Sequence, residues 1–80
     1  MFPTPELVKN YIAAGLSCSH VEVEGDGQRF KAIIVSEAFA GKRLIQRHQI
    51  VYAALGDRMR EEIHALSMKT LTPEEFATNG

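Results

Sequence analysis

Apolar residues recur at two different spacings in the first half of this 80-residue chain. Near the amino terminus they recur every three or four positions, which predicts a helix that begins after Thr4 and that Gly15 is placed to end. From His20 to Glu24 they alternate with polar residues, and Arg29 to Ser36 is more continuously apolar and rich in β-branched residues, which predicts two strands joined by a turn at Gly25–Gly27. The first half therefore predicts a helix followed by a β-hairpin.

The second half of the chain predicts a long helix, a short strand and a last helix. The long helix runs from Lys42 to about Arg60, and the strand from Glu62 to Thr70. At about 100° per residue, the predicted buried face of the long helix contains Leu44, Ile45, His48, Val51, Tyr52, Leu55 and Met59. Ile50 falls on the opposite side, so we expect it to face solvent or a partner protein. The last helix begins with a capping box, Thr72–Glu75, and Phe76 is expected to dock it.

The predicted order of elements is α-β-β-α-β-α, in one small α+β domain that spans residues 1–80. A strand that follows a long helix most often joins its sheet in parallel, through a right-handed crossover. We therefore expect a three-stranded mixed sheet with the helices packed on one face.

Composition narrows the class of protein. The chain is 45% hydrophobic and 24% charged, which is typical of a globular protein, and no apolar run approaches the about 20 residues of a membrane helix. Its single cysteine cannot form an internal disulfide and no secretory signal is visible, so we expect a cytoplasmic protein that does not bind membranes. We also expect no enzyme, because the chain has no nucleophile-elbow or phosphate-loop motif and little room for an enclosed pocket.

The net charge of −1 conceals a basic segment. From Gln28 to Gln49 the chain carries five basic residues and one acidic residue, whereas the rest carries four basic and nine acidic residues. This basic segment is either a solvated entrance to the long helix or a patch that binds an anion or a partner.

Histidine and cysteine side chains are the candidates for metal chemistry. His64, on the more apolar side of its strand, is either hydrogen-bonded inside the fold or held as a ligand for a metal or a partner. Cys18 is either a half-buried small residue or an accessible thiolate. His20 is typical of a plain surface histidine. His48 is typical of a packed histidine with an internal hydrogen bond.

Two segments resemble the BolA-like proteins, FKAIIVSEAFAGKRLIQRHQIVYAAL (30–55) and IHALSMKTLTPEEF (63–76). A third, VEVEGDGQRF (21–30), is similar to the IbaG-like branch of that family. The resemblance covers residues 6–76 and implies a fold related to the type II KH domain. The GKRL sequence at 41–44 lacks the second glycine of the GXXG loop with which KH domains grip phosphates.

The resemblance implies a non-enzymatic adaptor in iron–sulfur cluster assembly, trafficking and iron homeostasis. Members of the family look like partners of monothiol glutaredoxins, with which they share a [2Fe-2S] cluster that glutathione also helps to hold. By this resemblance His64 is a cluster ligand, and a His or Cys between the first two strands is the second. The loop 24–30 contains neither, and Arg29 stands where relatives of this branch often carry His. Cys18 and His20 are then the remaining candidates for the second ligand.

The partner surface is expected to include Arg29, Lys42, Arg43, Arg47 and an exposed Ile50. The resemblance also implies a second role, that of a DNA-binding transcriptional regulator of stress response and cell morphology. In that role Lys42, Arg43 and Arg47 would contact the nucleic acid. Alone, the chain is expected to be a monomer or a weak homodimer without a cluster.

Overall fold

The computed structural model describes residues 4–26, 29–57 and 66–79. Its elements are α1 (Pro5–Gly15), β1 (His20–Gly25), β2 (Phe30–Val35), the 3-10 helix η1 (Glu37–Phe39), α2 (Leu44–Leu55), β3 (Leu66–Leu71) and α3 (Pro73–Asn79). This order confirms the predicted one and adds a short helical turn to the connector. No helix in the described stretches has the length and apolar character needed to cross a membrane.

The three strands form one mixed sheet, as predicted, and their order in the sheet is β1-β2-β3. β1 and β2 are antiparallel, and β2 and β3 are parallel. At one end of the sheet, here called the Leu66 end, Phe30 pairs with both Gly25 and Leu66. At the other end, the Leu71 end, Val35 pairs with both His20 and Leu71. These two ends locate the segments that precede and follow the strands.

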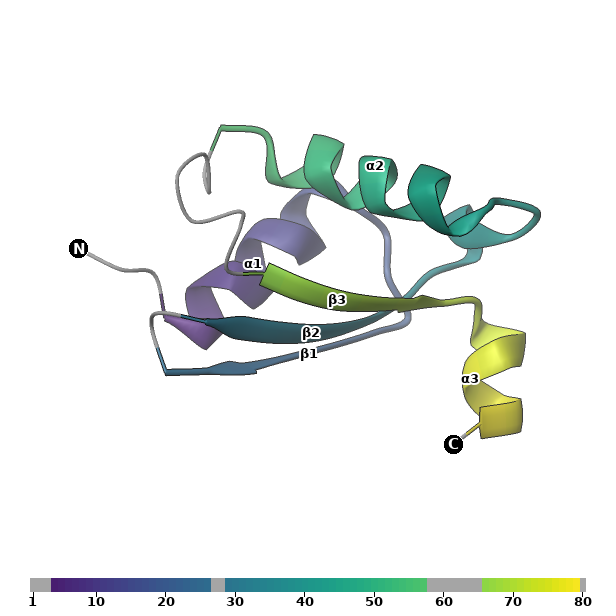
Figure 1. Cartoon of the computed structure of the whole chain (residues 1–80), viewed down its shortest axis with the longest axis horizontal. Coiled ribbons are helices and arrows are strands. Elements are labelled where there is room, and N and C mark those ends of the chain that lie inside the picture. Colours follow the sequence, from purple (N-terminus) through teal and green to yellow (C-terminus); the bar gives the residue numbers. More distant parts are fainter. Residues whose placement is uncertain (1–3, 27–28, 58–65, 80) are drawn as a thin grey trace.

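One face of the sheet is covered by α1 and α2 (Figure 1). The core between the layers is made of apolar side chains from all three strands and both helices: Val8, Ile12, Val21, Phe30, Ala32, Ile34, Val51, Leu55 and Leu66. α3 does not join this layer, because its Phe76 stacks on His20. In β1, His20 alternates with the core residue Val21, so it points to the opposite face. The expectation that all helices pack on one face is therefore wrong for α3.

α2 is shorter than predicted at both ends. It begins at Leu44 and ends at Leu55, well before the predicted end near Arg60. Gly56 follows with a φ of 59°, in the left-handed region that glycine adopts without steric cost and that stops an α-helix.

The buried side of α2 is also rotated from the predicted one. Val51 and Leu55 are buried as expected, but Ile50 is partly buried and packs against the core instead of facing solvent. Arg47 lies between Ile50 and Val51 around the helix, and its guanidinium binds groups of β3 and α3. That side of α2 consequently turns toward the sheet. The three residues that this rotation leaves exposed are Leu44, Ile45 and Tyr52.

Candidate functional site

The Leu66 end of the sheet combines the β1–β2 turn with the start of β3. The turn is closed by two hydrogen bonds: the Asp26 N–H donates to the Arg29 carbonyl at 3.2 Å, and the Arg29 N–H donates to Asp26 Oδ1 at 2.9 Å. A shallow, open depression beside it is lined by Arg29, Lys31 and Ser67 among others. This end of the sheet therefore presents two basic side chains next to the first residues of β3.

His64, the ligand that the family resemblance implies, lies outside the described residues. The described chain resumes at Leu66, two positions later, at this same end of the sheet. The assignment of His64 stays a prediction.

Cys18 precedes β1 and lies beyond the Leu71 end of the sheet. Its Sγ donates a hydrogen bond to the Leu16 carbonyl at 3.3 Å, and the side chain is half-buried against the core. Burial raises the pKa of the Cys18 thiol, which favours the thiol over the thiolate. These observations support the interpretation of Cys18 as a packed small residue and count against an accessible thiolate.

His20 is occupied in holding α3. Its ring stacks on Phe76, with ring centroids 4.9 Å apart and planes 23° from parallel. His20 Nε2 lies 3.2 Å from Glu22 Oε2, close enough for an ion pair when His20 is protonated but without the alignment of a hydrogen bond. His20 is thus not the plain surface histidine that its position in the sequence predicts. Phe76 docks the last helix, as predicted.

The structure separates the candidates for the second cluster ligand from the start of β3. His20 pairs with Val35 at the Leu71 end, whereas Leu66 pairs with Phe30. Five residue steps along β2 separate these ends, which is about 17 Å at roughly 3.3 Å per residue. In the stretches that the structure describes, no three His, Cys, Asp or Glu side chains are grouped so as to hold a metal ion.

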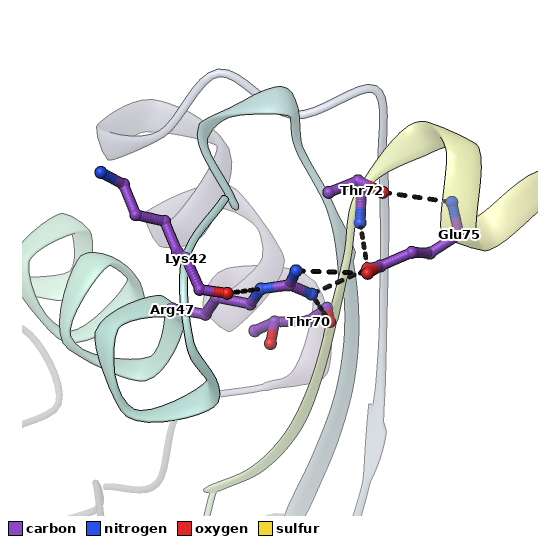
Figure 2. Close-up of polar contacts among 5 residues, drawn as sticks. All are labelled: Lys42, Arg47, Thr70, Thr72 and Glu75. Atoms are coloured by element: carbon purple, nitrogen blue, oxygen red, sulfur yellow. Dashed lines mark hydrogen bonds and ion pairs between the residues drawn. The ribbon is translucent and has the colours of Figure 1, made fainter. Parts of the chain in front are cut away.

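Arg47 joins α2 to β3 and α3 (Figure 2). Its guanidinium donates to both carboxylate oxygens of Glu75, at 2.7 and 3.2 Å, and to the backbone carbonyls of Lys42 and Thr70, at 3.0 and 3.1 Å. The Arg47 side chain is only 14% exposed. A side chain used in this way inside the fold is not available to grip a phosphate or a partner.

The predicted capping box of α3 is present and is coupled to Arg47. The Glu75 N–H donates to Thr72 Oγ1 at 3.1 Å, and the Thr72 N–H donates to Glu75 Oε1 at 2.9 Å. The hydrogen bonds from Arg47, and next the one from the Thr72 backbone, lower the pKa of Glu75 to about 2. The spacing of Thr72 and Glu75 predicts the box, but no local signal in the sequence identifies Arg47 as its third member.

Acid should remove the stabilisation that this junction provides, even though Glu75 in the folded protein stays ionised to a lower pH than an ordinary carboxylate. The Glu75 pKa is about 2 in the folded protein and 4.5 in its ordinary state, so its contribution to stability is full above about pH 4.5. It is lost as the pH falls from 4.5 to 2. Urea unfolding at several pH values should therefore show a steeper loss of stability in this range for the parent than for Glu75→Gln. Glu74→Gln, an exposed neighbouring change, should keep the steep loss; an equal slope in Glu75→Gln would contradict the role given to Glu75.

The predicted partner surface is divided by the fold. Arg29 lies at the Leu66 end, whereas Lys42 and Arg43 precede α2, whose first turn reaches β3 near Thr70 at the other end. Lys42 and Arg43 are exposed, and their side chains make no ion pair within the described part of the chain. Arg47 is engaged as described above. Of the predicted surface, only the two cations Lys42 and Arg43 remain together.

His48 is half-buried on α2, as predicted for a packed histidine. Its ring meets Tyr52 edge-on, with centroids 6.4 Å apart. His48 Nε2 is buried and finds no hydrogen-bond partner among the described residues, so the expected internal hydrogen bond is not seen there.

The element order, the mixed sheet and the attachment of α3 define a small α+β domain with α-β-β-α-β-α topology. The family model for the BolA-like proteins matches residues 12–75 of this chain. The chain therefore belongs to the BolA-like protein family.

Individual relatives agree with this assignment. The acid stress protein IbaG of Escherichia coli K12 is 37% identical over 71 residues, which cover 88% of this chain and 84% of IbaG. A Haemophilus influenzae relative named DNA-binding transcriptional regulator BolA is 40% identical over 57 residues, which cover 71% of this chain and 55% of that protein. A solved BolA homologue from Coxiella burnetii has a TM-score of 0.84 at 45% identity and covers 94% of this chain and 97% of its own.

Proposed function

We propose that this chain is a cytoplasmic, non-enzymatic adaptor that shares a [2Fe-2S] cluster with a monothiol glutaredoxin and glutathione. Family membership is the observation that carries the proposal. The IHAL segment (63–66) resembles the cluster-binding segment of the family and ends at Leu66, the first residue of β3, so His64 is the proposed ligand from this chain. The adaptor would serve cluster assembly or trafficking, and iron homeostasis with it.

The donor set of this chain fits one ligand and not two. The 24–30 loop has no His or Cys, Cys18 has a raised pKa, and His20 stacks on Phe76 at the Leu71 end. One imidazole does not hold a cluster by itself, so the other ligands would come from the partner and from glutathione. Arg29 and Lys31 lie at the Leu66 end, where positive charge favours an anionic thiolate-bound cluster.

Substitution of His64 gives the direct test. The chain is mixed with a monothiol glutaredoxin, glutathione, iron and sulfide, and visible absorption and circular dichroism are recorded. The parent should give a mixed-cluster spectrum that differs from that of the glutaredoxin alone, and His64→Ala should lose it.

Cys18→Ala and His20→Gln are the matched controls, because they remove the other candidate ligands. Both should retain the mixed-cluster spectrum, and far-UV circular dichroism should show that each variant is folded. An unchanged spectrum for His64→Ala would show that His64 is not the ligand.

DNA-binding regulation is the second candidate function, and the name of the Haemophilus influenzae relative supports it. The exposed pair Lys42 and Arg43 would contact phosphates, but Arg47 is held by Glu75. Two phosphate contacts correspond to a slope of only about −2 in log K against log salt concentration. The charge that remains exposed is thus small for this role, and a KH-like mode of gripping, with GKRL in place of GXXG, stays a prediction.

A further inference from the structure

The outward side of α2 carries three large exposed apolar side chains and no exposed charge, and its exposed polar residues are Gln46 and Gln49. Leu44 is 64% exposed, Ile45 is 67% exposed and Tyr52 is 40% exposed. The only charged residue of α2 is Arg47, and its guanidinium is bound inside the fold. The exposed side of a helix in a globular protein normally carries charged and polar residues. Figure 1 shows α2 on the outside of the molecule, with the sheet beneath it and no other labelled helix or strand above it.

These exposed side chains form a continuous stripe. Ile45 and Tyr52 are seven positions apart, so they project from the same side of the helix, about 10 Å apart along its axis. His48 lies between them, with its ring against Tyr52. Aliphatic and aromatic side chains with few charges among them are typical of the centre of a protein–protein interface.

A cationic group adjoins one end of the stripe. Lys42 and Arg43 immediately precede α2, are exposed, and have no ion-pair partner among the described residues. The amino-terminal end of the helix adds its own partial positive charge at this point. A partner that covers the stripe would therefore gain from carboxylates placed at this end.

We propose that these five residues, Lys42, Arg43, Leu44, Ile45 and Tyr52, form a docking face for a partner protein, through an apolar segment with acidic residues at one end. The proposal goes beyond the adaptor role and does not depend on the cluster. The docking face lies on α2, while the proposed cluster ligand precedes β3, so a protein could occupy the face whether or not a cluster is bound.

The chemistry of the docking face favours a protein over a nucleic acid or a membrane. Contacts to nucleic acid go largely to phosphates, which bind cations and hydrogen-bond donors. The exposed surface of α2 is instead dominated by three large apolar side chains. Helices that lie on membranes carry Lys and Arg along their polar side, whereas here two cations lie at one end only. An acidic and apolar protein segment matches both parts of the face.

Two synthetic helical peptides with the same leucine and phenylalanine stripe test the proposal. One carries glutamates at the end of the stripe and the other carries lysines. The full ¹⁵N-labelled chain is titrated with each peptide at low salt. The acidic peptide should shift the amide resonances of residues 42–53 and should bind at least about tenfold more tightly than the lysine peptide. Added salt should narrow this difference.

Ile45→Glu should weaken binding of the acidic peptide at least about tenfold, because it places a charge in the centre of the apolar stripe. Leu7→Glu is the matched control: it makes the same kind of change at an exposed apolar residue of α1 and should leave binding unchanged. Thermal unfolding should show that both variants are folded.

The proposal would be overturned by equal binding of the two peptides, or by unchanged binding to Ile45→Glu. Two further measurements address other occupants. If sedimentation shows a dimer of this chain that Ile45→Glu abolishes, a second copy occupies the face and the proposal is overturned. Stronger amide shifts with phosphatidylglycerol vesicles than with the acidic peptide would also overturn it. A folded Ile45→Glu variant that retains its mixed cluster with glutaredoxin would keep this result separate from the cluster proposal.

Discussion

Gly15→Ala is expected to destabilise the protein, although alanine is the better helix former. Gly15 is the last residue of α1 and does not have a positive φ, so helix propensity alone predicts a gain of about 0.5–1 kcal/mol. A Cβ at Gly15 would, however, lie 2.8 Å from the Ala54 Cα in α2 and 2.9 Å from its carbonyl carbon. These are backbone atoms, which cannot rotate aside as a side chain can. We therefore expect a net loss of about 1–3 kcal/mol, as is typical of overpacking.

The sign of the change decides between the two effects. Urea unfolding followed by far-UV circular dichroism should give a lower midpoint for Gly15→Ala with an unchanged slope. Ala14→Gly, at the exposed neighbouring position, measures the local effect of helix propensity and should lose about 0.5–1 kcal/mol. If Gly15→Ala instead gains what Ala14→Gly loses, the close approach of α1 to Ala54 does not limit the fold.

Gly15 also shows what the sequence could and could not predict. The sequence places this glycine at the end of the first helix, and the helix does end there. Glycine commonly follows or ends a helix because of its conformational freedom, whereas the structure shows Gly15 in close approach to Ala54, a residue 39 positions later. Spacing patterns report on neighbours in the chain, so they predict element order and caps. They carry no information about which helix lies against which.

The same limit explains the errors on α2 and at the candidate site. The helical projection places Ile50 outside because it considers only the spacing of apolar residues within the helix. It does not include the hydrogen bond of Arg47 to Glu75, 28 positions later, which turns this side of α2 toward the sheet. Cys18 and His20 are close in sequence to the turn between β1 and β2, yet His20 lies at the Leu71 end of the sheet and Cys18 lies beyond it, both away from Leu66. The family resemblance, by contrast, correctly identified the family. Its assignment of His64 remains to be tested by the substitution proposed above.

Phe39→Ala is expected to have the largest effect of any single change considered. Phe39 belongs to the short helix η1 in the connector between β2 and α2, and its side chain is completely buried in the core. Truncating a buried phenylalanine to alanine costs about 3–5 kcal/mol. A domain of this size has a total stability of roughly 4–12 kcal/mol, so the variant should lose much of it.

The connector has little freedom to collapse into the cavity that Phe39→Ala would leave. The Phe39 N–H donates to the Ser36 carbonyl at 3.2 Å, and the Lys42 N–H donates to the Phe39 carbonyl at 3.1 Å. Ser36 Oγ in turn donates to the Ser17 carbonyl at 2.6 Å, which ties the connector to the segment before β1. Because the backbone is held on both sides, the energy of the cavity is not recovered by a local shift.

Urea unfolding of Phe39→Ala and Phe39→Leu, compared with the parent, tests this anchoring role. Leucine refills part of the cavity, so Phe39→Leu should lose less stability than Phe39→Ala and should remain folded in water. Phe39 is buried and is not part of the docking face of α2. A folded Phe39→Leu, which keeps Lys42 and Arg43 in place, should therefore still bind the acidic peptide. If Phe39→Ala unfolds at the same urea concentration as the parent, the connector is not anchored by this side chain, and the position of Lys42 and Arg43 must be set by Arg47 and α2 alone.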